Sequence, residues 1–126
     1  MGYRSEVVLA IAKELIPFFV LLFPKDGVEK MVLNESDTFD RDYDGEKSWL
    51  IAWQDVKWYE SYPDVAAIEK FVADAESDKY SFTDDDGNEV NSSELIRFVR
   101  VGENNDDIEV RGDGFWDIRP ETSIVW

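Results

Sequence analysis

Three groups of carboxylates are the residues in this chain whose types and spacing could do chemistry. The first, Asp40-Arg41-Asp42-Tyr43-Asp44-Gly45, has the D-x-D-x-D-G spacing of a calcium-binding loop. Alternate carboxylates in such a loop wrap one cation, and the glycine permits a sharp turn. Asp40, Asp42 and Asp44 are therefore candidate metal ligands. The twelfth position should be a bidentate glutamate but is Ile51, which favours an acidic, solvated loop.

The other two acidic groups lie around expected turns. Asp84-Asp85-Asp86-Gly87-Asn88-Glu89 contains the residue types that tight turns require, so a hairpin turn explains it. The third group surrounds a later turn, between two expected strands. A carboxylate pair roughly 5–9 Å apart could hydrolyse a sugar, but such pairs lie in apolar clefts, and this turn is expected to be exposed. We therefore interpret the third group as partner-binding rather than catalytic; its residues are Glu103, Asp106, Asp107 and Glu109, with Asp113 nearby.

Aromatic residues are crowded into one short stretch, which contains Trp49, Trp53, Trp58, Tyr59 and Tyr62. Packing in the core, with a few rings at the rim, is the simplest interpretation. The alternative is a protein interface, because Trp and Tyr supply much of the binding energy where proteins meet. Trp53, Trp58 and Tyr59 are the candidate partner-binding residues of this stretch. Single-stranded nucleic acid is not an expected ligand, because stacking rings are then accompanied by basic residues.

The chain has a net charge of -16 and contains neither histidine nor cysteine. These absences exclude a Ser-His-Asp triad, a thiol nucleophile, a disulfide and a zinc-thiolate site. Phosphate-binding and dinucleotide-binding glycine motifs are also missing. Catalysis would have to rest on carboxylates, lysine, tyrosine or an oxygen-bound metal, and we expect neither an enzyme nor a cofactor.

The negative charge is concentrated beyond residue 33. Residues 1–33 contain four basic and four acidic side chains, whereas residues 34–126 contain nine basic and twenty-five acidic ones. Direct binding of nucleic acid is not expected, since phosphate contacts need lysine and arginine. A basic protein surface, or a cation, is the expected kind of partner.

The hydrophobic pattern predicts the elements that position these residues. Pro63 fits the first turn of a helix capped by Ser61, and its apolar face continues to Glu76. The segment 48–58 fits a strand, although one helical face would also accommodate its apolar residues. The other expected elements are a central strand over 2–12, helical pieces over 14–33 with a break at 24–27, a polar loop over 34–46, a hairpin over 80–91, strands over 95–101 and 108–111, an edge strand over 115–118, and a docked tail over 123–126.

This order of elements predicts an α+β fold: a mostly antiparallel sheet with two main helices packed on one face, in a single domain spanning 1–126. The longest apolar run, from Leu15 to Phe23, is shorter than the about 20 residues that span a bilayer. It also lacks the features of a signal peptide, because Lys13 and Glu14 separate it from the apolar residues before it and no small-x-small cleavage site follows. We expect no membrane association and a cytoplasmic location.

Several segments are similar to those of small acidic proteins encoded by phages and prophages, a family without a settled activity. The resemblance covers most of the chain in order, apart from residues 15–45 and those after 112. It implies a mobile-element origin and a bacterial host cytoplasm, and it supplies no catalytic residues. The matching segments are Met1-Gly2-Tyr3-Arg4-Ser5-Glu6-Val7, 53–59, 62–68, 96–103 and 106–109.

Three hypotheses follow. In the first, the chain is a phage-type acidic module that blocks a host nucleic-acid-binding protein of defence or regulation, like a DNA mimic or an anti-CRISPR protein. In the second, it binds a partner or a second copy of itself through the aromatic stretch or the apolar residues 15–33, and its charge serves solubility. In the third, it depends on Ca²⁺ or Mg²⁺ held by Asp40, Asp42 and Asp44. The first two share one function class, a non-enzymatic protein-binding module.

Overall fold

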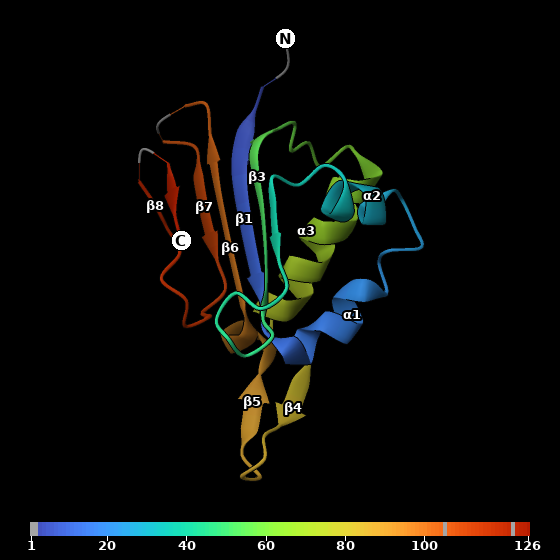
Figure 1. Cartoon of the computed structure of the whole chain (residues 1–126), viewed down its shortest axis with the longest axis vertical. Helices are drawn as coiled ribbons and strands as arrows, with labels where there is room; N and C mark the ends of the chain where they lie inside the picture. Colours follow the sequence, from blue (N-terminus) through green and yellow to red (C-terminus); the bar gives the residue numbers. More distant parts are fainter. Residues whose placement is uncertain (1–2, 105, 122) are drawn as a thin grey trace.

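A five-stranded antiparallel sheet is the centre of the computed structural model, which describes residues 3–104, 106–121 and 123–126 (Figure 1). The strand order is β2-β3-β1-β6-β7, so β1 is the middle strand, as predicted. The predicted start of this strand, Gly2, lies outside the described residues. The bounds are β1 Ser5–Ile11, β2 Thr38–Asp40, β3 Trp49–Val56, β6 Ile96–Gly102 and β7 Ile108–Arg111.

β1 is central because its residues are apolar on both faces. Val7, Val8, Leu9, Ala10 and Ile11 are all fully buried. A strand with alternating polar residues could leave one face in water, whereas this run must be covered on both sides. Helices cover one face of the sheet and the C-terminal segment covers the other. The predicted α+β fold with an antiparallel sheet is confirmed.

The helical layer consists of α1 (Ile16–Val20), α2 (Val28–Leu33) and α3 (Pro63–Glu76), with single 3₁₀ turns, η1 and η2, at Lys13–Leu15 and Ser92–Leu95. The helix breaks between α1 and α2, but over residues 21–27 rather than only the predicted 24–27: α1 ends at Val20, and Gly27, with a φ of 81°, is the N-cap of α2. None of the helices in the described chain is long and apolar enough to cross a bilayer.

α3 has the predicted apolar face, because Val65, Ile68, Phe71, Val72 and Ala75 are all buried. The prediction that Ser61 caps this helix is wrong. The N-cap residue is Tyr62, without a side-chain cap hydrogen bond, and Pro63 begins the first turn. Proline needs no partner for its missing N–H there.

Trp53 fills the space between the sheet and the helices. Its side chain is 1 % exposed, and its Nε1–H donates to the carbonyl oxygen of Met31 in α2 over 3.0 Å. The ring of Trp58 lies 5.4 Å from that of Trp53 and 5.9 Å from that of Phe98. Both tryptophans therefore belong to the core, as the simpler interpretation predicted.

The C-terminal segment covers the face of the sheet opposite the helices. Trp116, Ile118 and Ile124 are buried there, as expected for a docked tail. Arg97 donates to the carbonyl oxygens of Ile118 and Gly112, and so fixes the segment to β6. The segment contains two short paired strands, β8 (Arg119–Pro120) and β9 (Ile124–Val125).

Two predictions about strands are wrong. Residues 115–118 form no strand: Trp116 and Ile118 alternate with exposed neighbours because they pack on the sheet, without ladder hydrogen bonds. The polar segment 34–46 is not a loop throughout, because β2 pairs with β3 through Thr38, Phe39 and Asp40.

A separate two-stranded hairpin, β4 (Ser81–Thr83) and β5 (Glu89–Asn91), projects beyond the end of the sheet at the bottom of Figure 1. We call residues 81–91 the arm. Its base packs on α1, where the ring of Phe18 lies 5.8 Å from that of Phe82 and 4.7 Å from that of Tyr80. The predicted hairpin is thus confirmed, and its tip is held away from the rest of the molecule.

Candidate partner-binding surface

The register of the sheet places the predicted acidic groups at opposite ends. Ile11 at the end of β1 pairs with Trp49, so the loop that contains Asp40, Asp42 and Asp44 lies at that end. Ser5 at the start of β1 pairs with Gly102, so Glu103 and the residues that follow it lie at the other end. A seven-residue strand is about 20 Å long. The predicted site residues therefore do not form one surface.

The carboxylates of the calcium-like loop bind the loop itself. Asp40 accepts from the backbone N–H of Asp42, and Asp42 accepts from that of Lys47. Asp44 accepts from the backbone N–H of Glu46 and from the side chains of Ser48 and Trp116.

Burial alone would raise the pKa of Asp44, but these hydrogen bonds outweigh it and hold the pKa below its ordinary value. The third hypothesis is not supported by this arrangement, because the carboxylates of Asp40, Asp42 and Asp44 do not converge. Within the described ranges, no group of three or more acidic side chains could hold a metal ion. The loop instead ties β2 and β3 to the C-terminal segment.

At the other end, Arg100 forms ion pairs with two of the four predicted acidic residues, Asp107 and Glu109. Its Nη2 lies 2.7 Å from Asp107 and 2.9 Å from Glu109. The hydroxyl of Tyr3 also donates to Asp107, over 2.6 Å. The hydrogen bond from Arg100, reinforced by that from Tyr3, lowers the pKa of Asp107 to about 2. Asp107 and Glu109 are therefore structural residues that fix β7 to β6.

We expect Asp107 to stabilise the fold only while it is ionised. Its pKa in the folded chain is about 2, below the about 3.9 of an unfolded aspartate. Its contribution is therefore fully present above pH 4 to 5 and is lost as the pH falls towards 2. Urea unfolding of the wild type and of Asp107→Asn should differ most at pH 6 and least at pH 2.

Asp106→Asn is the matched control, because the neighbouring Asp106 is exposed and forms no ion pair with a described lysine or arginine. Its free energy of unfolding should track that of the wild type at every pH. An Asp107→Asn deficit that stays constant from pH 6 to pH 2 would contradict the role given to this carboxylate.

The candidate aromatic interface is largely buried. Trp53 and Trp58 are 1 % and 7 % exposed, so their rings belong to the core and are not available to a partner. The Nε1–H of Trp58 donates to Glu69 over 2.8 Å. Tyr59 is half-buried, and its ring lies 5.2 Å from that of Tyr62, which is 41 % exposed. Of the aromatic partner-binding candidates, only Tyr59 reaches the surface.

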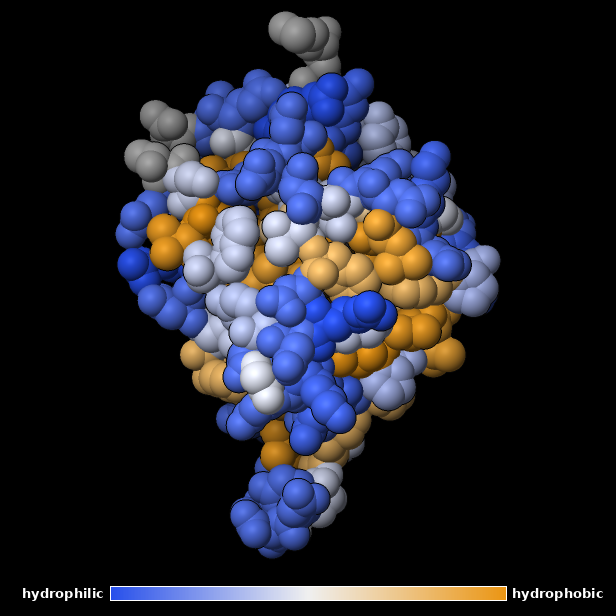
Figure 2. Space-filling view, in the orientation of Figure 1, coloured by the Kyte–Doolittle hydropathy of each residue, from blue (hydrophilic) through white to orange (hydrophobic). Residues whose placement is uncertain are grey.

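The arm has the densest group of exposed carboxylates, although sequence analysis explained it as a turn. Asp84, Asp85, Asp86 and Glu89 are all exposed, and none forms an ion pair with a described lysine or arginine. One sequence signal distinguishes them: no lysine or arginine lies between Lys79 and Arg97. Figure 2 shows the resulting hydrophilic tip at the bottom of the molecule.

The tip of the arm is ordered by its own backbone. Asp84 Oδ1 accepts from the N–H groups of Asp86 and Asn88 over 3.0 and 2.8 Å, and Gly87 takes a φ of 82° that suits glycine. Asp84 therefore shapes the turn, and the carboxylates of Asp85, Asp86 and Glu89 remain directed at solvent. A preformed turn presents its charges without an ordering cost on binding.

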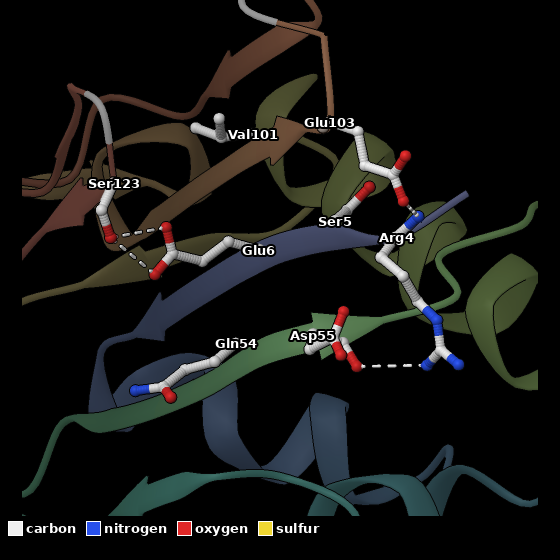
Figure 3. Close-up of a pocket in the computed structure, with 9 residues that line it drawn as sticks. Arg4, Ser5, Glu6, Gln54, Asp55, Val101, Glu103 and Ser123 are labelled. Carbon is white, nitrogen blue, oxygen red and sulfur yellow. Dashed lines mark hydrogen bonds between the residues drawn. The ribbon is translucent and has the colours of Figure 1, made fainter. Parts of the chain in front are cut away.

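A polar pocket of about 480 Å³ lies near the start of β1 (Figure 3). Glu6 accepts there from the hydroxyl of Ser123 and the backbone N–H of Ile124, and Glu103 accepts from the backbone N–H of Arg4 over 2.7 Å. These carboxylates join β1 to its neighbours. The pocket is wide and polar, unlike the apolar clefts of acid–base catalysts.

The charged ends of the molecule, and above all the arm, are therefore the candidate surface for a partner. Comparison with known proteins gives no family: no protein-family model matches the chain, and neither a curated protein nor a solved structure matches it.

Proposed function

We propose that the protein is a non-enzymatic, acidic binding module that inserts its arm into a basic groove of a partner protein. The observation that carries this proposal is the projecting hairpin whose tip has four exposed carboxylates, at Asp84, Asp85, Asp86 and Glu89. A narrow projection fits a groove, and a purely negative tip fits one lined by lysine and arginine.

The charge balance of the folded chain supports the same partner. Ion pairs engage a minority of its 29 acidic residues, namely Glu35, Glu69, Asp74, Glu76, Asp107, Glu109, Asp117 and Glu121. The other carboxylates have no lysine or arginine partner in the described chain, so the surface is strongly negative. Such a surface repels nucleic acid and accelerates association with basic proteins.

The biological setting that we propose is competition with nucleic acid for a host protein. A basic groove of this kind is what nucleic-acid-binding proteins use to hold phosphates, and a carboxylate-tipped arm would compete with the nucleic acid. Together with the resemblance to phage and prophage proteins, this chemistry supports an inhibitor of a host nucleic-acid-binding protein, of defence or of regulation, in the bacterial cytoplasm. Carboxylates of the arm would then stand in for backbone phosphates.

The first experiment is a pull-down from a bacterial lysate with the immobilised protein, washed at 50 and at 500 mM salt. The proposal expects a nucleic-acid-binding protein that is retained at low salt and displaced by added duplex DNA. The complex should weaken strongly at high salt, because screening reduces attraction between exposed charges. A partner retained at high salt and indifferent to DNA would refute the mimicry and favour the apolar-surface hypothesis.

The arm itself is tested by removing its charge while preserving its shape. Asp84→Asn, Asp85→Asn, Asp86→Asn and Glu89→Gln, combined, keep the Asp84 oxygen that shapes the turn. If the arm makes the contact, affinity for the captured partner should fall by about 100-fold or more, since four charge contacts are lost.

A control variant with the same net charge separates the arm from general electrostatics. Asp26→Asn, Glu29→Gln, Asp55→Asn and Glu60→Gln also remove four exposed charges, none of which forms an ion pair with a described basic residue. This variant should lose affinity by less than about tenfold, through weaker long-range steering. Equal losses in the two variants would show that net charge, and not the arm, governs binding.

A further inference from the structure

β7 is an open edge of the main sheet. It pairs with β6 on one side, and the sheet ends there. Proteins blunt exposed edges with short strands, charged side chains, proline or a β-bulge, since a free edge can pair with another chain. β7 is short and contains Glu109 and Arg111, but it has no proline or lysine, and its register with β6 has no irregularity.

The backbone groups that face this edge can be assigned from the ladder. The N–H of Gly102 donates to the carbonyl oxygen of Asp107, so this pair is hydrogen-bonded. Pairing alternates along an antiparallel ladder, so Glu109 and Arg111 direct their backbone groups at β6. The N–H and C=O groups of Ile108 and Val110 therefore point away from the sheet. No other group in the described chain forms a hydrogen bond with them.

The side chains of β7 divide into a charged row and an apolar row. Arg111 contacts Glu69 of α3 and the ring of Phe98, so Glu109 and Arg111 face the helices. Ile108 and Val110 lie on the opposite face, where they are 41 % and 43 % exposed. The edge thus offers the free backbone groups of Ile108 and Val110, their two exposed apolar side chains, and one acid and one base at alternate positions. The acid and the base also form ion pairs within the chain, Glu109 with Arg100 and Arg111 with Glu69 and Glu76.

We propose that β7 pairs with β7 of a second copy of this chain, antiparallel about a two-fold axis at Val110, so that the two sheets become continuous. In this register the hydrogen-bonding groups of Val110 meet those of its symmetry mate. Ile108 lies opposite Gly112, whose N–H and C=O already bond to Glu76 and Arg97, so the hydrogen bonds across the axis are those of Val110. Glu109 lies opposite Arg111 of the second copy, and Arg111 lies opposite Glu109. The exposed side chains of Ile108 and Val110 from both copies would gather on the face away from the helices.

Charge selects this register from the alternatives. A two-fold axis requires each residue to lie opposite one on the same face. An axis at Ile108 would place Asp107 opposite Glu109, and an axis at Glu109 would place two copies of that carboxylate directly opposite each other. An axis at Arg111 would do the same with two guanidinium groups. Like charges in directly opposed positions are unfavourable, and opposite charges are favourable. Val110 is therefore the centre that makes the edge complementary to itself.

The proposed pairing goes beyond the proposed function and has the opposite dependence on salt. Each copy has a net charge of -16, so two copies repel one another at long range. Added salt screens this repulsion, while the backbone hydrogen bonds and apolar contacts of β7 persist. Self-association should strengthen between 50 and 500 mM NaCl, the range over which binding through the arm should weaken.

A single cysteine tests the register directly, because the natural chain contains none. Residues opposite each other in a hydrogen-bonded antiparallel pair have Cα atoms about 5.5 Å apart, within the range of a disulfide. Under mild oxidation at 500 mM NaCl, Val110→Cys should form a covalent dimer on a non-reducing gel. Ile108→Cys is the matched control. In this register residue 108 lies opposite Gly112 of the second copy, four residues from the second copy's own residue 108, so this variant should give at least tenfold less dimer. Equal cross-linking of the two variants would overturn the register.

Sedimentation velocity of the cysteine-free chain tests the association itself. The weight-average mass should rise from that of one chain towards that of two between about 5 and 500 µM protein, more steeply at 500 than at 50 mM NaCl. Val110→Lys should stay monomeric, whereas Leu21→Lys should associate like the wild type, because Leu21 is 69 % exposed directly after α1 and outside β7. Circular dichroism verifies that both variants are folded. A wild type that stays monomeric throughout, or a Val110→Lys variant that still associates, would refute the proposal.

Discussion

Trp53→Ala is expected to lower the free energy of unfolding by about 3–5 kcal/mol, the largest effect of any single substitution considered for this chain. The indole is 1 % exposed and lies between the sheet and α2. Its loss removes a large buried apolar surface, leaves a cavity and leaves the carbonyl oxygen of Met31 without its donor. Small domains are stable by only about 5–15 kcal/mol, so urea unfolding should show a much lower midpoint.

Trp53→Phe separates the two contributions. Phenylalanine keeps most of the buried ring but cannot donate to Met31, so its loss should be smaller than that of Trp53→Ala. Trp53 was also a candidate interface residue, and the same variants test that role. If Trp53→Ala kept wild-type stability and lost only partner binding, the buried position of this residue would be wrong and the aromatic-interface hypothesis would be restored.

The parts of the fold that the sequence predicted are those with local patterns. The face of α3 repeats at helical spacing from Val65 to Ala75, and the arm has two short strands around Asp84–Gly87. The apolar run of β1 predicted a central strand because few other positions can bury Val7 to Ile11. In each case the signal lies within about fifteen consecutive residues.

The parts that were missed depend on distant partners. Thr38–Asp40 lies in a mostly polar, acidic segment, yet it forms β2 because β3 offers a free edge beside it and Phe39 packs against the ring of Trp49. Buried and exposed residues alternate over 115–118 as in a strand, but Trp116 and Ile118 pack on the face of a sheet whose strands are distant in sequence. Ser61 looked like a cap, but the cap position falls on Tyr62 because the helix begins at Pro63.

The acidic residues of the candidate site also depend on partners that are distant in sequence. The number of carboxylates can be read from the sequence, but which of them pair with an arginine depends on the folded chain. Asp107 and Glu109 looked as available as Asp106, and Arg100 distinguishes them only in the folded chain. The arm was explained as a turn, although the lack of any basic residue between Lys79 and Arg97 could have marked it as the least neutralised segment.

Glu69→Ala is expected to lower the free energy of unfolding by about 2–3 kcal/mol, the second largest effect. The side chain of Glu69 is 12 % exposed and holds two groups at once: Arg111 Nη1 over 2.6 Å and Trp58 Nε1 over 2.8 Å. Its removal leaves a shielded guanidinium and a buried indole N–H without their best acceptor. Breaking one side of a shielded pair costs more than the pair contributes, because the remaining charge stays out of water. Urea unfolding at pH 7 measures the loss.

Glu76 provides the comparison that isolates burial. It is a second partner of Arg111, at 3.3 Å, but its side chain is 40 % exposed. Glu76→Ala should therefore cost less than about 1 kcal/mol, and 0.5 M NaCl should remove most of that loss. More of the loss in Glu69→Ala should persist in salt, since this contact is better shielded from solvent ions than that of Glu76. Equal losses for the two variants would mean that Arg111 is solvated and does not fix β7 to α3. The edge strand would then lack the rigid support that pairing with a second copy requires, so the test bears on the proposed dimer as well as on stability.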